Sequence, residues 1–291
     1  MLAAAGALAG GTIPQLGALS ASRWSALLRD EREALPTAFA LESLANGVCY
    51  LAGPALVAVV GAEVDPAYGM LLATALVAGG GLALAAQHRT APAPAAAAER
   101  RDAGRSLLRA GFAAQFGVNL ALGLYFGAMQ VSVTAFAVEH RAAGAAAPLY
   151  AASNCAGLLA GWLYGLRRWR GTPERQLACI TACLAVACAP LLTVGTLAGM
   201  GLALTVTGLA VPPVLVLSAV LTSASVHPAA LTRAFTWLNS ASAAGSAGAA
   251  ALAGSVVDAY GAHGGFAVAA AATSAMAVLA SGRLRGARRR T

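Results

Sequence analysis

The sequence predicts an all-α protein that crosses a lipid bilayer many times. Hydrophobic residues make up 59% of the chain and charged residues only 10%, which leaves too little polar surface for a soluble globule of this length. The apolar residues gather in runs of ~17 residues or more, long enough for a helix to span the hydrocarbon core. The arginines fall into every second gap between these runs. Nine runs are predicted to be transmembrane helices: Leu2–Leu19, Pro36–Gly61, Tyr68–Ala86, Ala110–Val138, Pro148–Leu166, Leu177–Leu197, Met200–Ser225, Ala234–Val257 and Gly265–Ser281.

The placement of arginine also predicts the direction of each span. All 19 basic residues are arginine, and only Arg141 lies outside the C-terminal tail and the gaps after spans one, three, five and seven. Arginine is retained on the cytoplasmic side during insertion, so those gaps and the C-terminus are predicted to be cytoplasmic. The gaps predicted to be external carry acidic residues: Glu63, Asp65, Glu139 and Asp258. We therefore expect a multi-pass protein of the plasma membrane.

Two distant stretches of the sequence resemble each other and predict an internal repeat. Each has a proline late in one span, an arginine-bearing turn, an Ala-Phe pair, and an aspartate shortly before Tyr-Gly. Pairing Pro14 with Pro212 and Asp65 with Asp258 gives offsets of 198 and 193 residues, so spans one to three match spans seven to nine. Copies related by an axis along the membrane normal keep the same orientation, as this match requires.

The repeat divides the chain into three parts. Residues 1–86 form a partial N-terminal half of three spans, residues 87–109 a cytoplasmic linker, and residues 110–291 a complete half of six spans. The first half lacks counterparts of spans four to six. The chain also starts directly in a hydrophobic run, so we expect either a misassigned start site or a truncated product.

Three segments have a distinctive composition. In span two, Gly47 is followed by Gly53-Pro54. The last part of span five contains Gly161 and Gly165 and is followed by a basic segment that contains Arg168. Span eight and the turn before it are rich in glycine and small residues, with Phe235 and Trp237 near the start.

Together with the repeat, these segments resemble the major facilitator superfamily, whose members have twelve helices in two six-helix halves around a central cavity. The resemblance implies that the nine spans match helices four to twelve. Gly53-Pro54 is similar to the antiporter signature of helix five, and Gly161 to Arg170 to the glycine-rich basic loop of the second half. The stretch Arg233 to Asp258 is similar to helix eleven of actinobacterial-type drug or sugar efflux members. The resemblance implies that Gly53, Pro54, Gly161, Gly165 and Arg168 act in conformational change.

Span four carries the candidate substrate-binding residues. Its polar and aromatic side chains recur at steps of four and seven residues: Gln115, Asn119, Phe126, Gln130 and Thr134. Such steps return to one face of a helix. Amides in hydrocarbon cost free energy unless they meet water or a partner, so we expect either substrate contacts in a wet cavity or interhelical hydrogen bonds. Asn154 on span five and Asn239 on span eight are further candidates.

Glu42 is the acidic residue that the prediction places within a span, and Asn46 lies one turn further along the same face. An ionisable group at membrane depth is a candidate for proton coupling. Because Glu42 is close to the predicted cytoplasmic end, an ion pair with an arginine such as Arg23, Arg29 or Arg32 is the alternative.

Glycine spacing predicts close helix packing in two spans. Span five has Gly157, Gly161 and Gly165 at four-residue steps. Span eight has Gly245, Gly248 and Gly254 among alanines and serines. Small residues let helix backbones approach closely.

Other function classes receive less support from the sequence. The chain has no lysine, which excludes a Walker A phosphate-binding loop. Its five cysteines lie within predicted spans without nearby partner ligands, so we expect apolar packing and no metal or cofactor. The net charge of +8 is explained by topology, so no nucleic-acid partner is expected.

The sequence therefore predicts a secondary transporter that exports a small molecule, a drug, sugar or metabolite, by alternating access coupled to protons. Its partners are the solute, protons and the lipid bilayer, and the sequence leaves the oligomeric state open. The main alternative is a truncated membrane fragment that does not transport. A membrane-embedded enzyme is a weaker alternative, because no hydrolytic motif is found.

Overall fold

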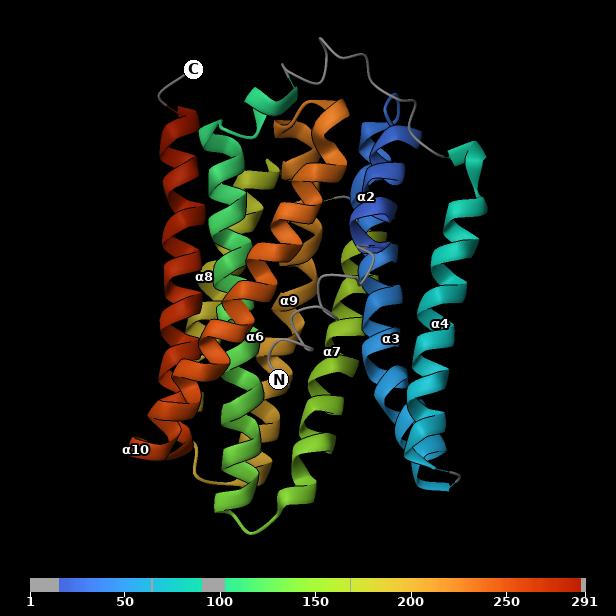
Figure 1. Cartoon of the computed structure of the whole chain (residues 1–291). Helices are drawn as coiled ribbons and strands as arrows, with labels where there is room; N and C mark the ends of the chain where they lie inside the picture. Colours follow the sequence, from blue (N-terminus) through green and yellow to red (C-terminus); the bar gives the residue numbers. More distant parts are fainter. Residues whose placement is uncertain (1–15, 64, 91–102, 168, 289–291) are drawn as a thin grey trace.

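A computed structural model describes residues 16–63, 65–90, 103–167 and 169–288. Over these ranges the chain forms helices and turns and no strand, which confirms the predicted all-α class. The long helices run side by side as one bundle (Figure 1). The N-terminal part contains α2 (Leu16–Leu27), the short 3-10 turn η1 (Arg32–Ala34), α3 (Leu35–Glu63), α4 (Pro66–Ala86) and η2 (His88–Thr90). The C-terminal part contains α6 (Ala110–Glu139), η3 (Ala143–Ala145), α7 (Ala146–Leu166), α8 (Pro173–Ala187), η4 (Ala189–Leu192), α9 (Leu197–Ser225), η5 (Pro228–Ala230) and α10 (Leu231–Arg288).

The first predicted span differs from the structure. Most of Leu2–Leu19 lies outside the described residues, and α2 continues to Leu27, through an arginine expected in the cytoplasmic gap. The Arg23 guanidinium donates hydrogen bonds to the carbonyl oxygens of Leu84 (2.9 Å) and Gln87 (3.0 Å). A cation at the last carbonyls of a helix is favourable, so the end of α4 accommodates the charge of α2.

The boundary between spans six and seven is also corrected. Span six was predicted to reach Leu197, but α8 gives way to a 3-10 turn at Ala189–Leu192, because Pro190 has no N–H for an α-helical hydrogen bond. The next helix starts at Leu197 instead of Met200. The Thr196 hydroxyl caps it by accepting a hydrogen bond from the Gly199 N–H at 3.2 Å.

Spans eight and nine, predicted with a seven-residue gap between them, form the two arms of α10. The arms meet at Gly261, whose φ of 72° and ψ of −175° are not helical. Glycine tolerates this conformation because it has no Cβ. The following N–H, of Ala262, donates to Glu139 Oε1 at 2.7 Å, so the turn is fastened to α6. Figure 1 shows the orange and red arms of α10 running in opposite directions beside α6.

Contacts between loops show which gaps share an end of the bundle. Arg23, after predicted span one, meets Gln87, after span three. Thr37 Oγ1, at the start of α3, donates to the carbonyl oxygen of Gly165, at the end of α7 (3.1 Å). These contacts gather arginine-bearing gaps at one end of the bundle, which we call the arginine-rich end.

The acidic gaps gather at the other end. Glu139 contacts the Gly261 turn through Ala262, and His140 Nε2 lies 2.9 Å from the carbonyl oxygen of Gly195. The 30 residues of α6 connect the two ends, a length of ~45 Å. The alternation of gaps therefore agrees with the prediction, while the assignment of one end to the cytoplasm stays a prediction.

Equivalent positions of the two similar stretches meet inside the bundle. The hydroxyl oxygens of Ser25 and Ser223, 198 residues apart, are 3.0 Å from each other. The ring centroids of Phe39 and Phe235, from the two Ala-Phe pairs, are 6.1 Å apart. Residues next to a two-fold axis contact their own symmetry equivalents. The parallel repeat itself stays a prediction.

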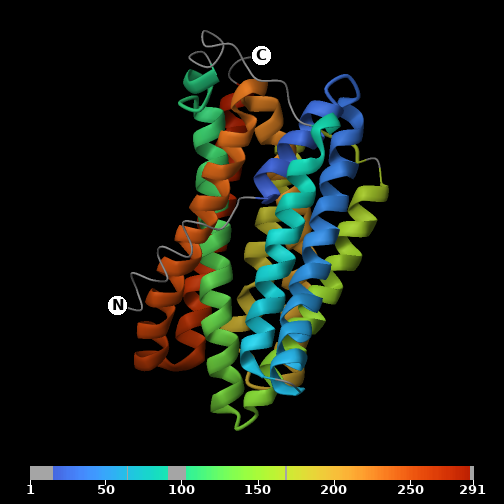
Figure 2. The same cartoon turned by 45° about the vertical axis from the view of Figure 1, so that its right-hand side comes forward.

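Five helices of the described chain are long and apolar enough to cross a membrane: Ala67–Ala86, Ala110–Glu139, Pro173–Leu192, Leu197–Ser225 and Pro228–Gly282. The fifth contains both arms of α10. Only 6% of the most apolar stretch of the first helix is buried, against 61% in the second. Accordingly α4 lies at the edge of the bundle against α3, whereas α6 packs against α10 (Figures 1 and 2). The chain is thus compatible with a membrane location.

Candidate functional site

The predicted polar face of α6 begins with a buried hydrogen-bonded pair. Asn119 is 8% exposed. Its Nδ2 donates to Ser218 Oγ on α9 (2.7 Å) and to the carbonyl oxygen of Gln115 (2.8 Å). The amide therefore connects α6 with α9 across the bundle.

Gln115 is completely buried, and its side-chain amide has no partner. Neither Nε2 nor Oε1 forms a hydrogen bond within the described part of the chain. Leaving a buried polar group unpaired costs about 1–3 kcal/mol. Two donor hydrogens and one acceptor oxygen next to the Asn119–Ser218 pair are the groups that a water molecule or a polar ligand would satisfy.

The second part of the predicted stripe is uncovered. Phe126 is 39% exposed and lies 5.5 Å from the Tyr125 ring, measured between centroids. Gln130 and Thr134 are also exposed, and Thr134 Oγ1 donates to the carbonyl oxygen of Gln130 (2.9 Å). Along α6 the stripe thus passes from a closed segment near the arginine-rich end to an open segment near the acidic end.

The two other asparagine candidates are not joined to this stripe. Asn154, on α7, is half-buried, and no hydrogen bond in the described ranges links it to α6. Asn239 is exposed on the first arm of α10. A Cβ at Gly17 would lie 3.9 Å from its Nδ2, which places Asn239 near α2.

Glu42 is held at the α2–α3 contact. The Ser20 side chain lies beside its carboxylate, and Oε2 is buried without a hydrogen-bond partner in the described chain. Within the described chain, Glu42 forms no ion pair with Arg23, Arg29 or Arg32, and the Arg23 guanidinium binds the end of α4 instead. Asn46, one turn on, is exposed.

The residues assigned to conformational change occupy different environments. Arg168 lies outside the described residues. Gly53 and Pro54 lie within α3, and a Cβ at Gly53 would meet open space. By contrast, a Cβ at Gly161 would lie 3.2 Å from Pro212 Cβ, and one at Gly165 would lie 2.6 Å from Ala40 Cβ.

Glycine packing follows the prediction at some positions only. Gly157 and Gly161 face α9, Gly165 faces α3, and Gly245 faces the backbone of α6. Gly248 and Gly254 have open space where a Cβ would point. The cysteines are also corrected: Cys188 is buried, but the other four are exposed and do not pack in the core. No group of metal-ligating side chains occurs within the described ranges.

Two further features next to the stripe were not predicted from the sequence. Ser218, the partner of Asn119, carries a hydroxyl group in a long apolar run. An isolated polar residue of this kind is the sequence feature that could have indicated a buried hydrogen bond. Gly123 and Gly127 let α10 approach α6, because a Cβ there would overlap the carbonyl groups of Ser242 and Ser246. Their four-residue spacing is a pattern typical of close helix contacts.

The comparisons with known proteins add no relationship to this geometry. No model of a known protein family matches the sequence, and no curated protein matches it.

Proposed function

We propose that the protein is a secondary transporter of the major facilitator type, which moves a small molecule across the plasma membrane by alternating access. The proposed direction is efflux, coupled to proton entry, with the C-terminus in the cytoplasm. Solute would bind along α6, between the half formed by α2–α4 and the half formed by α6–α10.

The observation that carries this proposal is the unpaired amide of Gln115. A stable bundle that served only as scaffold would gain free energy from an apolar side chain at this position. A binding site instead needs polar groups that are satisfied by solute or water in part of the cycle. The uncovered stripe from Phe126 to Thr134 continues the same face toward the acidic end.

The contacts between equivalent residues support alternating access. Ser25–Ser223 and Phe39–Phe235 join the two halves toward the arginine-rich end. Rocking of one half against the other would break these contacts and cover the exposed stripe at the opposite end. The described arrangement is then the state closed at the proposed cytoplasmic side.

Glu42 is the proposed proton carrier. Its buried Oε2 has no partner in the described chain, and it lies on α3, next to the closed contact of the halves. A carboxyl group that is neutral in one state and charged in the other can link proton transfer to opening.

Transport by the purified chain in proteoliposomes tests the proposal. With a pH gradient imposed, we expect accumulation of at least one compound from a broad panel of drugs, sugars and metabolites. Gln115→Leu should reduce transport at least tenfold, and Glu42→Gln should remove its dependence on the gradient. Ser274→Ala is the control, since Ser274 is exposed on α10 and bonds only within its helix.

Absence of transport for every compound in the panel would contradict the proposal and leave the alternative of a non-transporting membrane fragment. Equal activity of Gln115→Leu and Ser274→Ala would instead remove α6 as the binding surface. Cysteines placed at Tyr68 and Thr90, if labelled from the same compartment, would overturn the proposed topology.

A further inference from the structure

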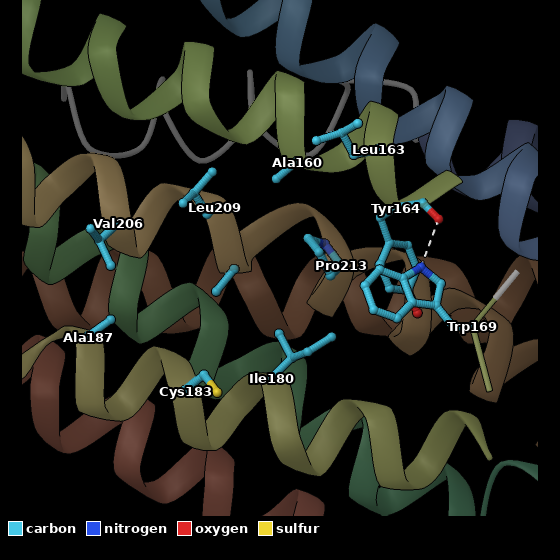
Figure 3. A pocket seen from close by; sticks show the side chains of 11 residues that line it. Ala160, Leu163, Tyr164, Trp169, Ile180, Cys183, Ala187, Val206, Leu209 and Pro213 are labelled. Carbon is cyan, nitrogen blue, oxygen red and sulfur yellow. Dashed lines mark hydrogen bonds between the residues drawn. The ribbon is translucent and has the colours of Figure 1, made fainter. Parts of the chain in front are cut away.

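An apolar groove opens on the outside of the bundle between α7, α8 and α9, away from the α6 stripe. Its volume is about 400 Å³. Leu163 from α7, Ile180 from α8 and Leu209 from α9 line it, and Figure 3 shows these side chains around the open space. The lining offers almost no hydrogen-bonding groups along its length. A polar solute would therefore find no partners there, whereas a hydrocarbon chain would fit.

The arginine-rich end of the groove is closed by an aromatic pair. Trp169, in the loop after α7, stacks on Tyr164 with ring centroids 5.2 Å apart. Its Nε1 donates to the carbonyl oxygen of Tyr164 at 3.1 Å, as Figure 3 shows. The Tyr164 hydroxyl donates in turn to Gln176 Oε1 on α8 (2.7 Å). The indole is thus fixed at the point where the apolar lining ends.

Positive charge lies directly at this end. The Arg167 guanidinium carbon is 4.9 Å from the centre of the Trp169 ring. Arg167 and Arg170 are both exposed. In the described chain, neither forms an ion pair with an acidic residue that would neutralise it. The groove therefore combines a hydrocarbon-sized channel with the Arg167 cation at one end, and Arg170 follows Trp169 directly in the chain.

From this combination we propose that the groove is a binding site for an anionic phospholipid. One acyl chain lies between α7, α8 and α9, and the phosphate group lies against Arg167 and Arg170. Tryptophan belongs at the level of lipid headgroups, where its ring meets hydrocarbon and its N–H meets polar groups. Basic pockets between membrane helices recognise anionic headgroups in this way. The site requires that the chain lies in a bilayer, and not that it transports a solute.

Fluorescence of Trp169 provides the test. The other tryptophans are replaced by phenylalanine (Trp24→Phe, Trp162→Phe, Trp237→Phe), and the full chain is reconstituted in phosphatidylcholine vesicles. Phosphatidylglycerol or phosphatidylcholine brominated on its chains is then added, because bromine quenches tryptophan only at short range. We expect a preference for phosphatidylglycerol of about fivefold or more, the effect of one arginine near an anionic lipid.

Variants distinguish specific binding in the groove from general attraction of the lipid to surface charge. Arg167→Gln with Arg170→Gln should abolish the preference. Arg29→Gln with Arg32→Gln, which removes the same charge at the same end but outside the groove, should leave it intact. Cys183→Phe, which fills the groove from an exposed position, should weaken quenching by the anionic lipid.

Three results would overturn the proposal. Equal quenching by the two lipids in the parent would show no preference. An equal loss in the Arg29/Arg32 variant would show bulk attraction, and unchanged quenching in Cys183→Phe would show that no chain occupies the groove. If the Arg167/Arg170 variant does not fold, the parent comparison and Cys183→Phe still decide the question. Solute transport that persists without lipid preference would reject this site and leave the proposed function standing.

Discussion

Gln115 and Ser218 are both neighbours of Asn119, but substitutions at the two residues should change stability in opposite directions. Gln115→Met replaces an unpaired buried amide with an apolar side chain of similar length, so we expect higher stability, by about 1 kcal/mol or more. Ser218→Ala removes the partner of Asn119 Nδ2 and should lower stability by ~0.6 kcal/mol, the average for a hydrogen bond between membrane helices. Thermal unfolding of the detergent-solubilised variants measures both effects. A loss of stability in Gln115→Met would mean that the amide has a structural partner.

His140 makes stability depend on pH. Its Nδ1 and Nε2 each lie 2.9 Å from a carbonyl oxygen, of Phe136 and Gly195. Only the imidazolium carries a hydrogen on both nitrogens. These hydrogen bonds, with a smaller effect of the neighbouring Glu139 carboxylate, raise the pKa of His140 above its ordinary 6.5. The stabilisation is therefore fully present below pH 6.5 and is lost as pH rises through the raised pKa.

The midpoint of thermal unfolding, measured for the parent and for His140→Asn from pH 5 to pH 9, tests this. The two midpoints should differ most at low pH and converge at high pH. Glu139 is the charged neighbour that acts on His140. The Phe136 ring packs against both His140 and His263 of α10, and His263 Nε2 lies 3.0 Å from the carbonyl oxygen of Val194. His88→Asn, at the other end of the bundle, is the control. A difference that is constant with pH would disprove the role of the imidazolium.

Among the helices, the close contact between α6 and α10 depends on glycines, which have no side chain. A Cβ at Gly123 would overlap the carbonyl group of Ser242, and backbone cannot move aside as a flexible side chain can. Gly123→Ala should therefore destabilise the bundle by about 1–3 kcal/mol, the usual cost of overpacking. Gly248→Ala, in the partner helix, faces open space and should stabilise by about 0.5–1 kcal/mol through helix propensity. Unfolding of the two variants side by side gives the comparison, and equal effects would contradict the close approach.

The sequence predicts elements well where their ends are encoded locally. Span three was predicted to begin at Tyr68, two residues after the true start of α4 at Pro66, and its predicted end at Ala86 is correct. The Asp65 side chain accepts a hydrogen bond from the Ala67 N–H at 2.8 Å, so the residues that fix this start are adjacent to it. The turn between the arms of α10 is different. It needs Glu139, more than a hundred residues earlier, to bind the Ala262 N–H. The local pattern around Asp258 predicted a longer gap because this distant acceptor could not be seen.

The candidate site shows the same limit. Periodicity placed Gln115, Asn119, Phe126, Gln130 and Thr134 on one face of a helix. It could not tell which of them a neighbour covers, because burial depends on the position of α9. Ser218 supplies that neighbour for Asn119, and no helix of the described chain buries Gln130.

For the molecule as a whole, the paired positions of the predicted repeat test whether the two proposed halves move against each other. Ser25 and Ser223 approach to 3.0 Å between hydroxyl oxygens, which is close enough to test with a disulfide or a short bifunctional thiol reagent. The variant Ser25→Cys with Ser223→Cys is made in a chain whose five native cysteines are replaced by serine or alanine. Cross-linking should hold the arginine-rich end closed and stop transport, and reduction should restore it.

Each single cysteine variant, treated with the same oxidant, controls for chemical damage. The end of the bundle at which the cross-linked chain is closed is more informative than the loss of transport alone. If the halves rock about the contact of equivalent residues, the cross-linked chain still exposes Gln130 and Thr134, so a cysteine at either position stays reactive toward reagents added from the acidic end. A cross-linked chain that transports at the parent rate would show that Ser25 and Ser223 stay together throughout the cycle. Alternating access between the two halves would then be wrong, because the contact that has to open would have remained closed.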